Sequence, residues 1–223
     1  VRRLLDGEKF RVKQMSIEIE KNIESRKETD RVMWFSMWFL ISVASFGIVW
    51  FLMIYFLIKR RNYHFLRQEK LETLILTKLR QLSREQPRLK NTASNSVKIE
   101  NIKLFRNPQA WALSTLLVFP AFYIFYFLGI DLQKHEEHEH AFLTEAISLA
   151  QNLGLDINLD DFKATKNFAL KRYLASTIVT CGLAAGYWLY RIFNDYNRHF
   201  KRQWKLEDEL LSFFKAINSS KAS

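Results

Sequence analysis

NYHFLRQEKLE (62–72) and NRHFKRQWKLE (197–207) are two versions of one polar, basic phrase, separated by a constant offset of 135 residues. Eight of their eleven positions are identical. The same offset pairs Gly47 with Gly182, well before the quoted words begin. Similarity of this kind within one chain indicates that a structural unit has been duplicated. We therefore expect an apolar segment followed by an amphipathic helix at both places.

Three stretches of the 223-residue chain are long and apolar. They are MWFSMWFLISVASFGIVWFLMIYFLI (33–58), QAWALSTLLVFPAFYIFYFLGI (109–130) and YLASTIVTCGLAAGYWLYRIF (173–193), the last within a segment 171–193. At about 1.5 Å of rise per residue, a helix of any of these lengths crosses a hydrocarbon core about 30 Å thick. The first two contain no charged residue, and the third contains only Arg191 near its end. The sequence therefore predicts an all-α, polytopic membrane protein with three transmembrane helices, each followed by an amphipathic helix in a degenerate internal repeat.

The segments outside the apolar stretches are charged, and the chain carries a formal net charge of +11. We predict a helical N-terminal extension (1–32), a basic amphipathic helix with a linker (59–108), an acidic helix with a loop (131–170) and a basic amphipathic helix with a tail (194–223). Segment 59–108 holds 13 Lys and Arg against 4 Asp and Glu, whereas segment 131–170 holds 3 against 8. The positive-inside rule then predicts a multi-pass protein of the cytoplasmic membrane, with the N-terminus outside and the C-terminus inside. On this interpretation the middle unit is acidic because it emerges on the opposite side of the membrane.

A histidine opens the apolar stripe of each predicted amphipathic helix. His64 and His199 stand at equivalent places in the two phrases, and His135 holds the same place in a fainter third copy of the unit. The residues seven, eleven and eighteen positions beyond each histidine are apolar and fall on the histidine's face of a helix. We predict that these histidines, with Asn62 and Asn197, support packing between the repeats. A pH-sensing or ligand-binding role for the histidines is the alternative.

The middle copy carries the run KHEEHEH (134–140), which is the candidate metal site of the sequence. Residues three or four positions apart lie on one face of a helix. His135, His138, Glu139 and His140 therefore form pairs that could share one divalent transition metal. The run lacks the HExxH pattern of zinc hydrolases. A solvated, charged helix start that binds no metal is the alternative.

Small residues in the third apolar segment predict close helix packing. The motif GLAAG places Gly182 and Gly186 four residues apart, a spacing that lets a second helix approach closely. Gly47 occupies the position equivalent to Gly182. Pro120 lies in the middle of the second apolar segment and is expected to kink or break a helix there. We expect a homo-oligomer or a subunit of a membrane complex.

The sequence contains no catalytic motif, so we expect a protein that is not an enzyme. It lacks a phosphate-binding glycine loop, a nucleophile elbow and paired Cys and His at zinc-binding spacing. Because the basic residues flank the apolar segments, the expected partner is a lipid bilayer with anionic headgroups rather than a nucleic acid. The predicted function is a non-enzymatic membrane scaffold or accessory subunit. Two alternatives remain: a membrane-protein insertase or insertion helper, and metal or ion binding by the His/Glu run.

The segment YRIFNDYNRHFKRQWKLEDELL (190–211), with the apolar stretch before it, resembles small multi-pass prokaryotic membrane proteins of unknown function, chiefly archaeal. In that group a glycine-containing span ends in a tyrosine-rich segment and runs into a helix with an N-x-H-F motif. The resemblance covers mainly 173–214 and, through the duplication, 42–82. The middle unit departs from the pattern. The resemblance implies a helical membrane fold and adds no activity.

Overall fold

The computed structural model describes residues 14–84, 105–152 and 169–220, and within these ranges it is helical and contains no strand. The helices are α2 (Arg26–Thr29), α3 (Phe35–Ala44), α4 (Ile48–Arg84), α5 (Pro108–Ser114), α6 (Val118–Asn152), α7 (Leu170–Val179) and α8 (Leu183–Ser220). Residues 14–24 are also helical. The predicted all-α class is confirmed.

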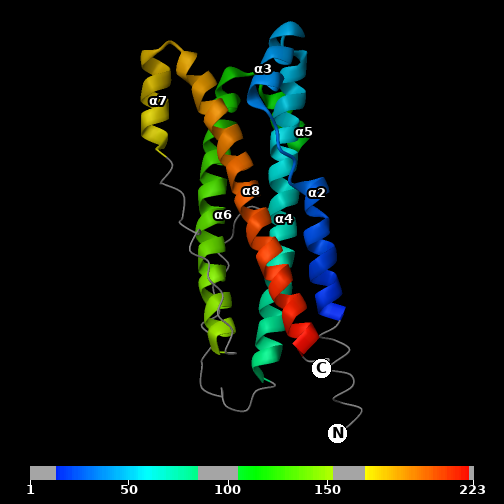
Figure 1. Ribbon diagram of the computed structural model, residues 1–223. Coiled ribbons are helices and arrows are strands. Elements are labelled where there is room, and N and C mark those ends of the chain that lie inside the picture. Colours follow the sequence, from blue (N-terminus) through cyan, green and yellow to red (C-terminus); the bar gives the residue numbers. More distant parts are fainter. Residues whose placement is uncertain (1–13, 85–104, 153–168, 221–223) are drawn as a thin grey trace.

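Three long helices, α4, α6 and α8, form the body of the molecule, and each is preceded by a short helix after which the chain reverses direction (Figure 1). Helix α3 packs against α4 and α7 packs against α8, whereas α5 packs mainly against α4 and less against α6. All three pairs lie at the same end of the molecule (Figure 1). The fold is therefore built from three helical hairpins, each with one short arm and one long arm.

Glycines at the same offset of 135 form the turns of the first and third hairpins. Gly47 has φ +88° and Gly182 has φ +97°, in the left-handed region that glycine adopts without a steric penalty. The N–H of Gly47 donates to the carbonyl of Ser42 at 2.8 Å, and the N–H of Gly182 donates to the carbonyl of Thr177 at 2.8 Å. These bonds close the end of the short helix, so the chain reverses instead of continuing in one helix.

A hydroxyl residue at each of these turns caps the helix that follows. The Ser45 hydroxyl accepts from the N–H of Val49 at 3.0 Å, and the Thr180 hydroxyl accepts from the N–H of Ala184 at 2.9 Å. Hydroxyl side chains at this place satisfy amides that have no partner inside the helix. The repeated sequence thus encodes both the end of one helix and the start of the next.

These turns divide the segments predicted to cross a membrane. Segment 33–58 is shared between α3 and the start of α4, and the uncharged start of α4 extends only over residues 48–58. Segments 109–130 and 171–193 are divided in the same way. A membrane-spanning helix needs about 20 consecutive, mainly apolar residues. In the part of the chain that the structure describes, no helix combines the length and the hydrophobicity needed to cross a bilayer.

The prediction of three transmembrane helices is therefore wrong, and so is the multi-pass localisation that depended on it. The prediction assumed that a long apolar segment forms one straight helix. Instead the chain turns back near the middle of each apolar segment, and both ends of the segment lie on the same side of the turn (Figure 1).

The acidic middle unit, in α6, lies beside the basic helix α4. The sequence interpretation had placed it on the opposite side of a membrane. Arg61 of α4 is paired with Asp131 of α6 at 2.9 Å, and Arg80 is paired with Glu145 at 2.6 Å. The acidity of the middle unit is explained by these contacts, since its carboxylates neutralise basic side chains of a neighbouring helix. The structure thus replaces the explanation taken from the positive-inside rule.

Two apolar clusters fill the bundle, with a layer of buried polar side chains between them. The first cluster, nearer the turns, includes Ile54, Leu128 and Phe193. The second includes Ile75 and Leu210 and takes residues from the helical segment 14–24. The three predicted amphipathic helices therefore pack against one another through their apolar stripes. The polar layer between the clusters holds the repeated histidines and asparagines.

The glycines predicted to support helix packing make no such contact with the residues that the structure describes. A Cβ atom added at Gly47, Gly182 or Gly186 would meet no atom within 4 Å. Gly47 and Gly182 serve the turns instead. Pro120 lies in the first turn of α6, where proline is tolerated, and the chain bends before it at residues 115–117.

Candidate metal centre

His64 in α4, His135 in α6 and His199 in α8 meet between the three long helices. One ring nitrogen of each lies within 4.8 Å of one ring nitrogen of each of the others. The three ring centroids are 5.0–5.3 Å apart. All three side chains are buried. Each repeat unit thus delivers the same side chain to one point in the bundle.

Two of the histidines are oriented by carboxylates. The Nδ1 atom of His64 lies 2.9 Å from an Asp30 oxygen, and the Nδ1 atom of His199 lies 3.2 Å from a Glu136 oxygen. An ionised carboxylate only accepts hydrogen bonds, so these two contacts favour a proton on each Nδ1, although at His199 an N–H of Arg202 also approaches Nδ1, at 3.5 Å. The lone pair of each neutral ring is then on Nε2. Carboxylates commonly orient metal-binding histidines in this way.

The Nε2 atoms of His64 and His199 face each other at 3.0 Å. With both protons on Nδ1, two lone pairs point at one another. The buried Nε2 atom of His135 has no hydrogen-bond partner among the described residues. A cation bonded to these nitrogens would relieve the repulsion and satisfy the third ring.

Burial keeps the three rings neutral. Removal from water lowers the pKa of His64 to about 4, against the opposing effect of Asp30. Burial likewise lowers the pKa of His135 well below its usual value, and neighbouring His199 and His64 add to the effect. The pKa of His199 is lowered by burial although Glu136 opposes the shift. Neutral imidazole is the form that binds a metal.

Aromatic rings shield the histidines from water. The ring of Phe65 stacks on His135 with centroids 4.1 Å apart, and the ring of Phe200 lies 4.4 Å from that of His64. Phe65 and Phe200 directly follow His64 and His199 in the repeated phrase. The H-F pair therefore supplies both a buried ring nitrogen of the cluster and part of its apolar surroundings.

Asp30 is held by four side chains. Besides His64, it accepts hydrogen bonds from Arg67 at 2.6 Å, from the indole of Trp204 at 3.0 Å and from the hydroxyl of Thr29 at 2.8 Å. Burial opposes ionisation of Asp30, but His64 and Arg67 outweigh burial and hold the pKa of this carboxyl below its usual range. Asp30 therefore carries its negative charge beside the histidines.

A second carboxylate group lies on the α6 side of the histidines. Arg202 donates to Glu136 at 2.8 Å. Glu139 lies 3.9 Å from both Arg202 and His199, and its two buried oxygens have no hydrogen-bond partner among the described residues. Burial raises the pKa of Glu139 well above its usual value.

The repeated asparagines fasten the hairpins to one another. Asn197 of α8 bonds both the N–H of Met33, at 3.2 Å, and its carbonyl, at 2.7 Å. Asn62 of α4 bonds the carbonyl of Arg106 at 2.6 Å and its N–H at 3.2 Å. One long helix thus holds the chain just before the short helix of another hairpin. The two phrases make the same kind of contact in two places.

The run 134–140 does not converge on one point. His135 joins the histidine cluster and Glu139 lies near it, whereas His138 turns to Glu72, 2.9 Å away, and His140 is exposed. The candidate ligands therefore come from three helices rather than from neighbouring positions of one helix.

Two carboxylates contact the histidine cluster: Asp30, which the sequence interpretation missed, and Glu136, which it had paired with His140 as possible metal ligands. Glu136 directly follows His135, which is a local signal. Asp30 lies outside the repeat, and no sequence pattern connects it with His64. The repeated histidine was the available signal for the centre itself, because duplicated units that pack together bring equivalent residues close.

The chain matches no protein-family model, no curated protein and no solved structure.

Proposed function

We propose that the protein binds one divalent transition metal through His64, His135 and His199. The observation that carries the proposal is the 3.0 Å approach of two Nε2 atoms whose Nδ1 atoms both face carboxylates. Among the described residues, these three form the one group of His, Cys, Asp and Glu side chains close enough to share an ion. Three imidazoles suit zinc, copper, nickel or cobalt rather than magnesium or calcium.

The spacing of the ligands supports a metal of this class. Metal–nitrogen bonds of about 2.0–2.1 Å at tetrahedral angles place ligand nitrogens about 3.3 Å apart. The His64–His199 separation is 3.0 Å, and each pair in the cluster lies within 4.8 Å. Small rotations of the side chains therefore bring all three nitrogens to bonding distance without moving the helices.

The surrounding charges also fit a divalent cation. Carboxylates outnumber guanidinium groups around the histidines: Asp30, Glu136, Glu139 and Glu207 stand against Arg26, Arg67 and Arg202. When all are ionised, one negative charge is in excess. Burial raises the pKa of Glu207 to about 7, against the opposing effect of Arg67. A bound dication would favour ionisation of Glu139 and Glu207, so metal binding should release protons and strengthen as the pH rises.

A metal at this point would connect the three long helices to one another. Its binding energy would add to the stability of the folded state, since the unfolded chain does not assemble the three ligands. We therefore assign the metal a structural role. The insertase alternative stays a prediction from the sequence.

The competing explanation is a purely structural histidine pair. If His199 carried its proton on Nε2, it would donate to Nε2 of His64 and no metal would be needed. The carboxylate of Glu136 favours the proton on Nδ1 of His199 instead. This explanation also leaves Nε2 of His135 without a partner.

A metal titration tests the proposal directly. The full chain, freed of metal with a chelator, is titrated with Zn²⁺ by calorimetry and with Co²⁺ by absorption spectroscopy. We expect one metal per chain, a tetrahedral or five-coordinate cobalt spectrum and a higher unfolding temperature with metal. Replacing any one of His64, His135 or His199 with Leu should abolish these effects.

His138→Ala and His140→Ala are the matched controls, because they remove histidines from the same helix outside the cluster. Both should retain the wild-type stoichiometry and affinity. Loss of binding in these controls but not in His135→Leu would refute the three-helix centre in favour of the run 134–140. Failure of the folded wild-type chain to bind either ion would support the histidine pair.

A further inference from the structure

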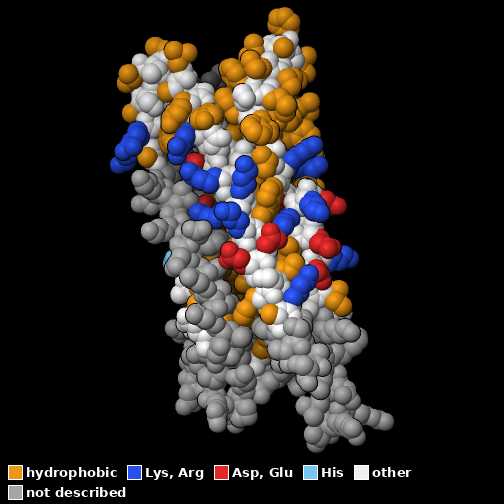
Figure 2. Space-filling view, viewed as in Figure 1, with side chains coloured by type: hydrophobic (Ala, Val, Ile, Leu, Met, Phe, Trp, Pro, Cys, Tyr) orange, Lys and Arg blue, Asp and Glu red, His pale blue; other side chains and the backbone are white. Residues whose placement is uncertain are grey.

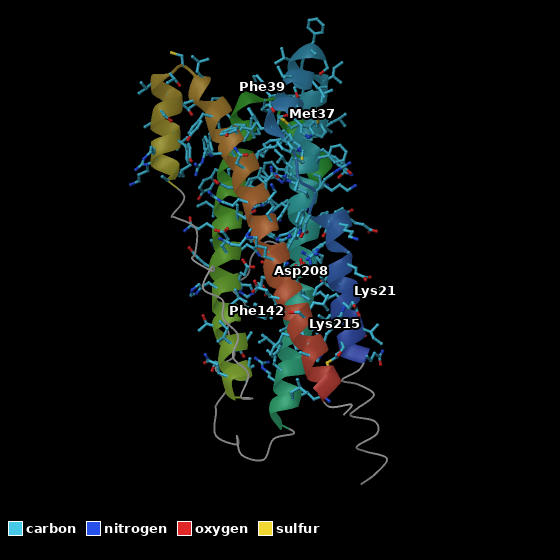
Figure 3. All side chains as sticks on the ribbon, viewed as in Figure 1. Lys21, Met37, Phe39, Phe142, Asp208 and Lys215 are labelled. Atoms are coloured by element: carbon cyan, nitrogen blue, oxygen red, sulfur yellow. The ribbon has the colours of Figure 1, made fainter. Side chains whose placement is uncertain are left out.

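The end of the bundle that carries the hairpin turns is an exposed apolar surface (Figure 2). The segments that build it contain no charged residue, and they are 32–58, 107–130 and 173–190. Phe46 is 100% exposed, Phe119 is 87% exposed and Leu183 is 85% exposed. Met37 and Phe39 lie in the same region (Figure 3). Exposed apolar surface of this extent indicates an interaction site.

Basic side chains lie where the chain enters and leaves this apolar end. Five of the six boundaries carry one, and these are Arg31, Lys59, Arg106, Arg172 and Arg191. The sixth carries Asp131, which is buried and accepts two hydrogen bonds from Arg106. In Figure 2 a band of Lys and Arg side chains lies directly below the apolar side chains, and the Asp and Glu side chains are mostly farther away.

Hydrogen bonds and ion pairs between the hairpins hold the ends of the three uncharged segments at a similar height along the bundle. The Arg60 guanidinium donates to the carbonyl of Arg31 at 3.2 Å and to the side chain of Asn197 at 2.9 Å. Arg61 and Arg106 both pair with Asp131. The boundaries of the three uncharged segments therefore lie close together along the bundle, and on the face seen in Figure 2 the Lys and Arg side chains form one band.

We propose that the apolar end inserts into one leaflet of a lipid bilayer with anionic headgroups, and that the basic band lies at the headgroups. The protein then lies on one face of the bilayer and does not cross it. Helix α3 has 10 residues. At about 1.5 Å per residue it is about 15 Å long, which is half of a hydrocarbon core about 30 Å thick.

The backbone of the turns suits an apolar environment, where unpaired polar groups are costly. At the first turn the N–H of Phe46 donates to Val43 at 3.1 Å, and the N–H of Ile48 donates to Ser45 at 3.1 Å. At the third turn Cys181 and Leu183 make the equivalent bonds at 3.2 Å. The chain therefore reverses without presenting unpaired amides at these positions.

Aromatic side chains stand beside the basic band, as they do at membrane interfaces. Trp34 is 69% exposed and follows Arg31 closely in the sequence. Tyr190 is exposed next to Arg191, and Lys59 lies 5.6 Å from the ring centroid of the exposed Tyr63. Indole and phenol rings prefer the headgroup region because they are apolar with one polar atom.

Charge complementarity favours lipid over a second copy of the chain. In a second copy, the same apolar end is bordered by the same basic side chains, so two such ends brought together would place like charges side by side. Anionic headgroups form a continuous negative plane next to hydrocarbon, which matches a positive band around an apolar tip. The proposal does not depend on metal binding.

Cys181 provides a direct test, because it is exposed at the third turn and is the sole cysteine of the chain. The full chain carries a polarity-sensitive fluorophore at Cys181. It is mixed either with vesicles of phosphatidylcholine alone or with vesicles that also contain about 30 mole per cent of the anionic lipid phosphatidylglycerol. We expect a blue shift and quenching by acyl-chain bromines with the anionic vesicles. The control label at Ser212→Cys in a Cys181→Ser background, near the other end of α8, should show neither.

Two pairs of substitutions test the contributing surfaces. Lys171→Ala with Arg172→Ala removes two exposed charges of the band and should weaken binding to anionic vesicles about 30-fold, at about five-fold per charge. Lys70→Ala with Lys205→Ala removes two exposed charges away from the band and should change binding much less. Phe46→Asp should also weaken binding, and circular dichroism should show unchanged helicity, because Asp tolerates the positive φ of this position.

Three outcomes would overturn the proposal. The label at Cys181 could remain unaffected by both kinds of vesicle. The labels at 181 and 212 could respond equally, which would indicate adsorption without orientation. Without lipid, the label at 181 could already be shielded in a particle of twice the monomer mass, which would show that a second copy covers the apolar end.

Discussion

Asp30 accepts a hydrogen bond from His64 at 2.9 Å although 34 positions separate the two residues. Asp30 lies in the link between α2 and α3, outside the duplicated phrase. This contact connects the N-terminal segment to the centre formed by the repeats. It also favours the tautomer of His64 in which Nε2 is free to bind the proposed metal. The contact should therefore affect both the stability of the fold and the metal affinity.

Asp30→Asn should weaken both properties. We expect a loss of about 3 kcal/mol in the free energy of unfolding, because Arg67 and Trp204 lose a buried ionised partner. Metal affinity should fall about 10- to 100-fold, as when a carboxylate behind a histidine ligand is removed. Urea unfolding and calorimetry measure the two effects. Asp208→Asn, which alters an exposed pair with Arg26, should cost less than about 1 kcal/mol.

Acid should destabilise the metal-free protein through its histidines. The pKa of His64 is about 4 in the folded state, below the value of about 6.5 that histidine has in an unfolded chain. Below pH 6.5 the unfolded chain takes up the proton first, so stability is lost as the pH falls through this range. The contribution of His64 alone is about 3 kcal/mol. Urea unfolding of His135→Leu should show a smaller loss on acidification, because one buried histidine is gone; an unchanged loss would contradict the assignment.

Glu207 should produce the opposite trend. Its pKa is raised to about 7, so between pH 4.5 and 7 the folded state holds a proton that the unfolded state releases. Stability from this group is therefore present at the lower pH and is lost as the pH rises toward 7, by up to about 3 kcal/mol. Unfolding curves of metal-free Glu207→Gln should lack this contribution. The same pH dependence in wild type and variant would show that Glu207 does not titrate in this range.

The turn glycines should be sensitive to a single methyl group. Gly47→Ala and Gly182→Ala should each cost about 1–2 kcal/mol, because alanine adopts a left-handed conformation at that penalty. Gly186→Ala is the matched control within α8, where alanine favours the helix by about 0.5–1 kcal/mol and would meet no neighbouring atom within 4 Å. Thermal unfolding of the three variants measures the difference. Equal effects at all three positions would contradict the assignment of left-handed turns to Gly47 and Gly182.

The sequence by itself determined the helical class, the duplicated unit and the positions of the equivalent histidines. Helical periodicity, apolar composition and repetition are local properties, and they survive whatever the chain does at longer range. The division into apolar and basic parts was also visible. The structure retains that division as an apolar end and a basic band around it.

Only the tertiary structure decided where the chain turns and which polar groups meet. Hydrophobicity did not distinguish a spanning helix from a hairpin, because that difference lies in the left-handed turns at Gly47 and Gly182. The contacts of His64 with His199 and with Asp30 join residues 135 and 34 positions apart. The repeat identified the equivalent histidines, but their mutual distances and the contact with Asp30 depend on the packing of whole helices against one another, which no local pattern encodes.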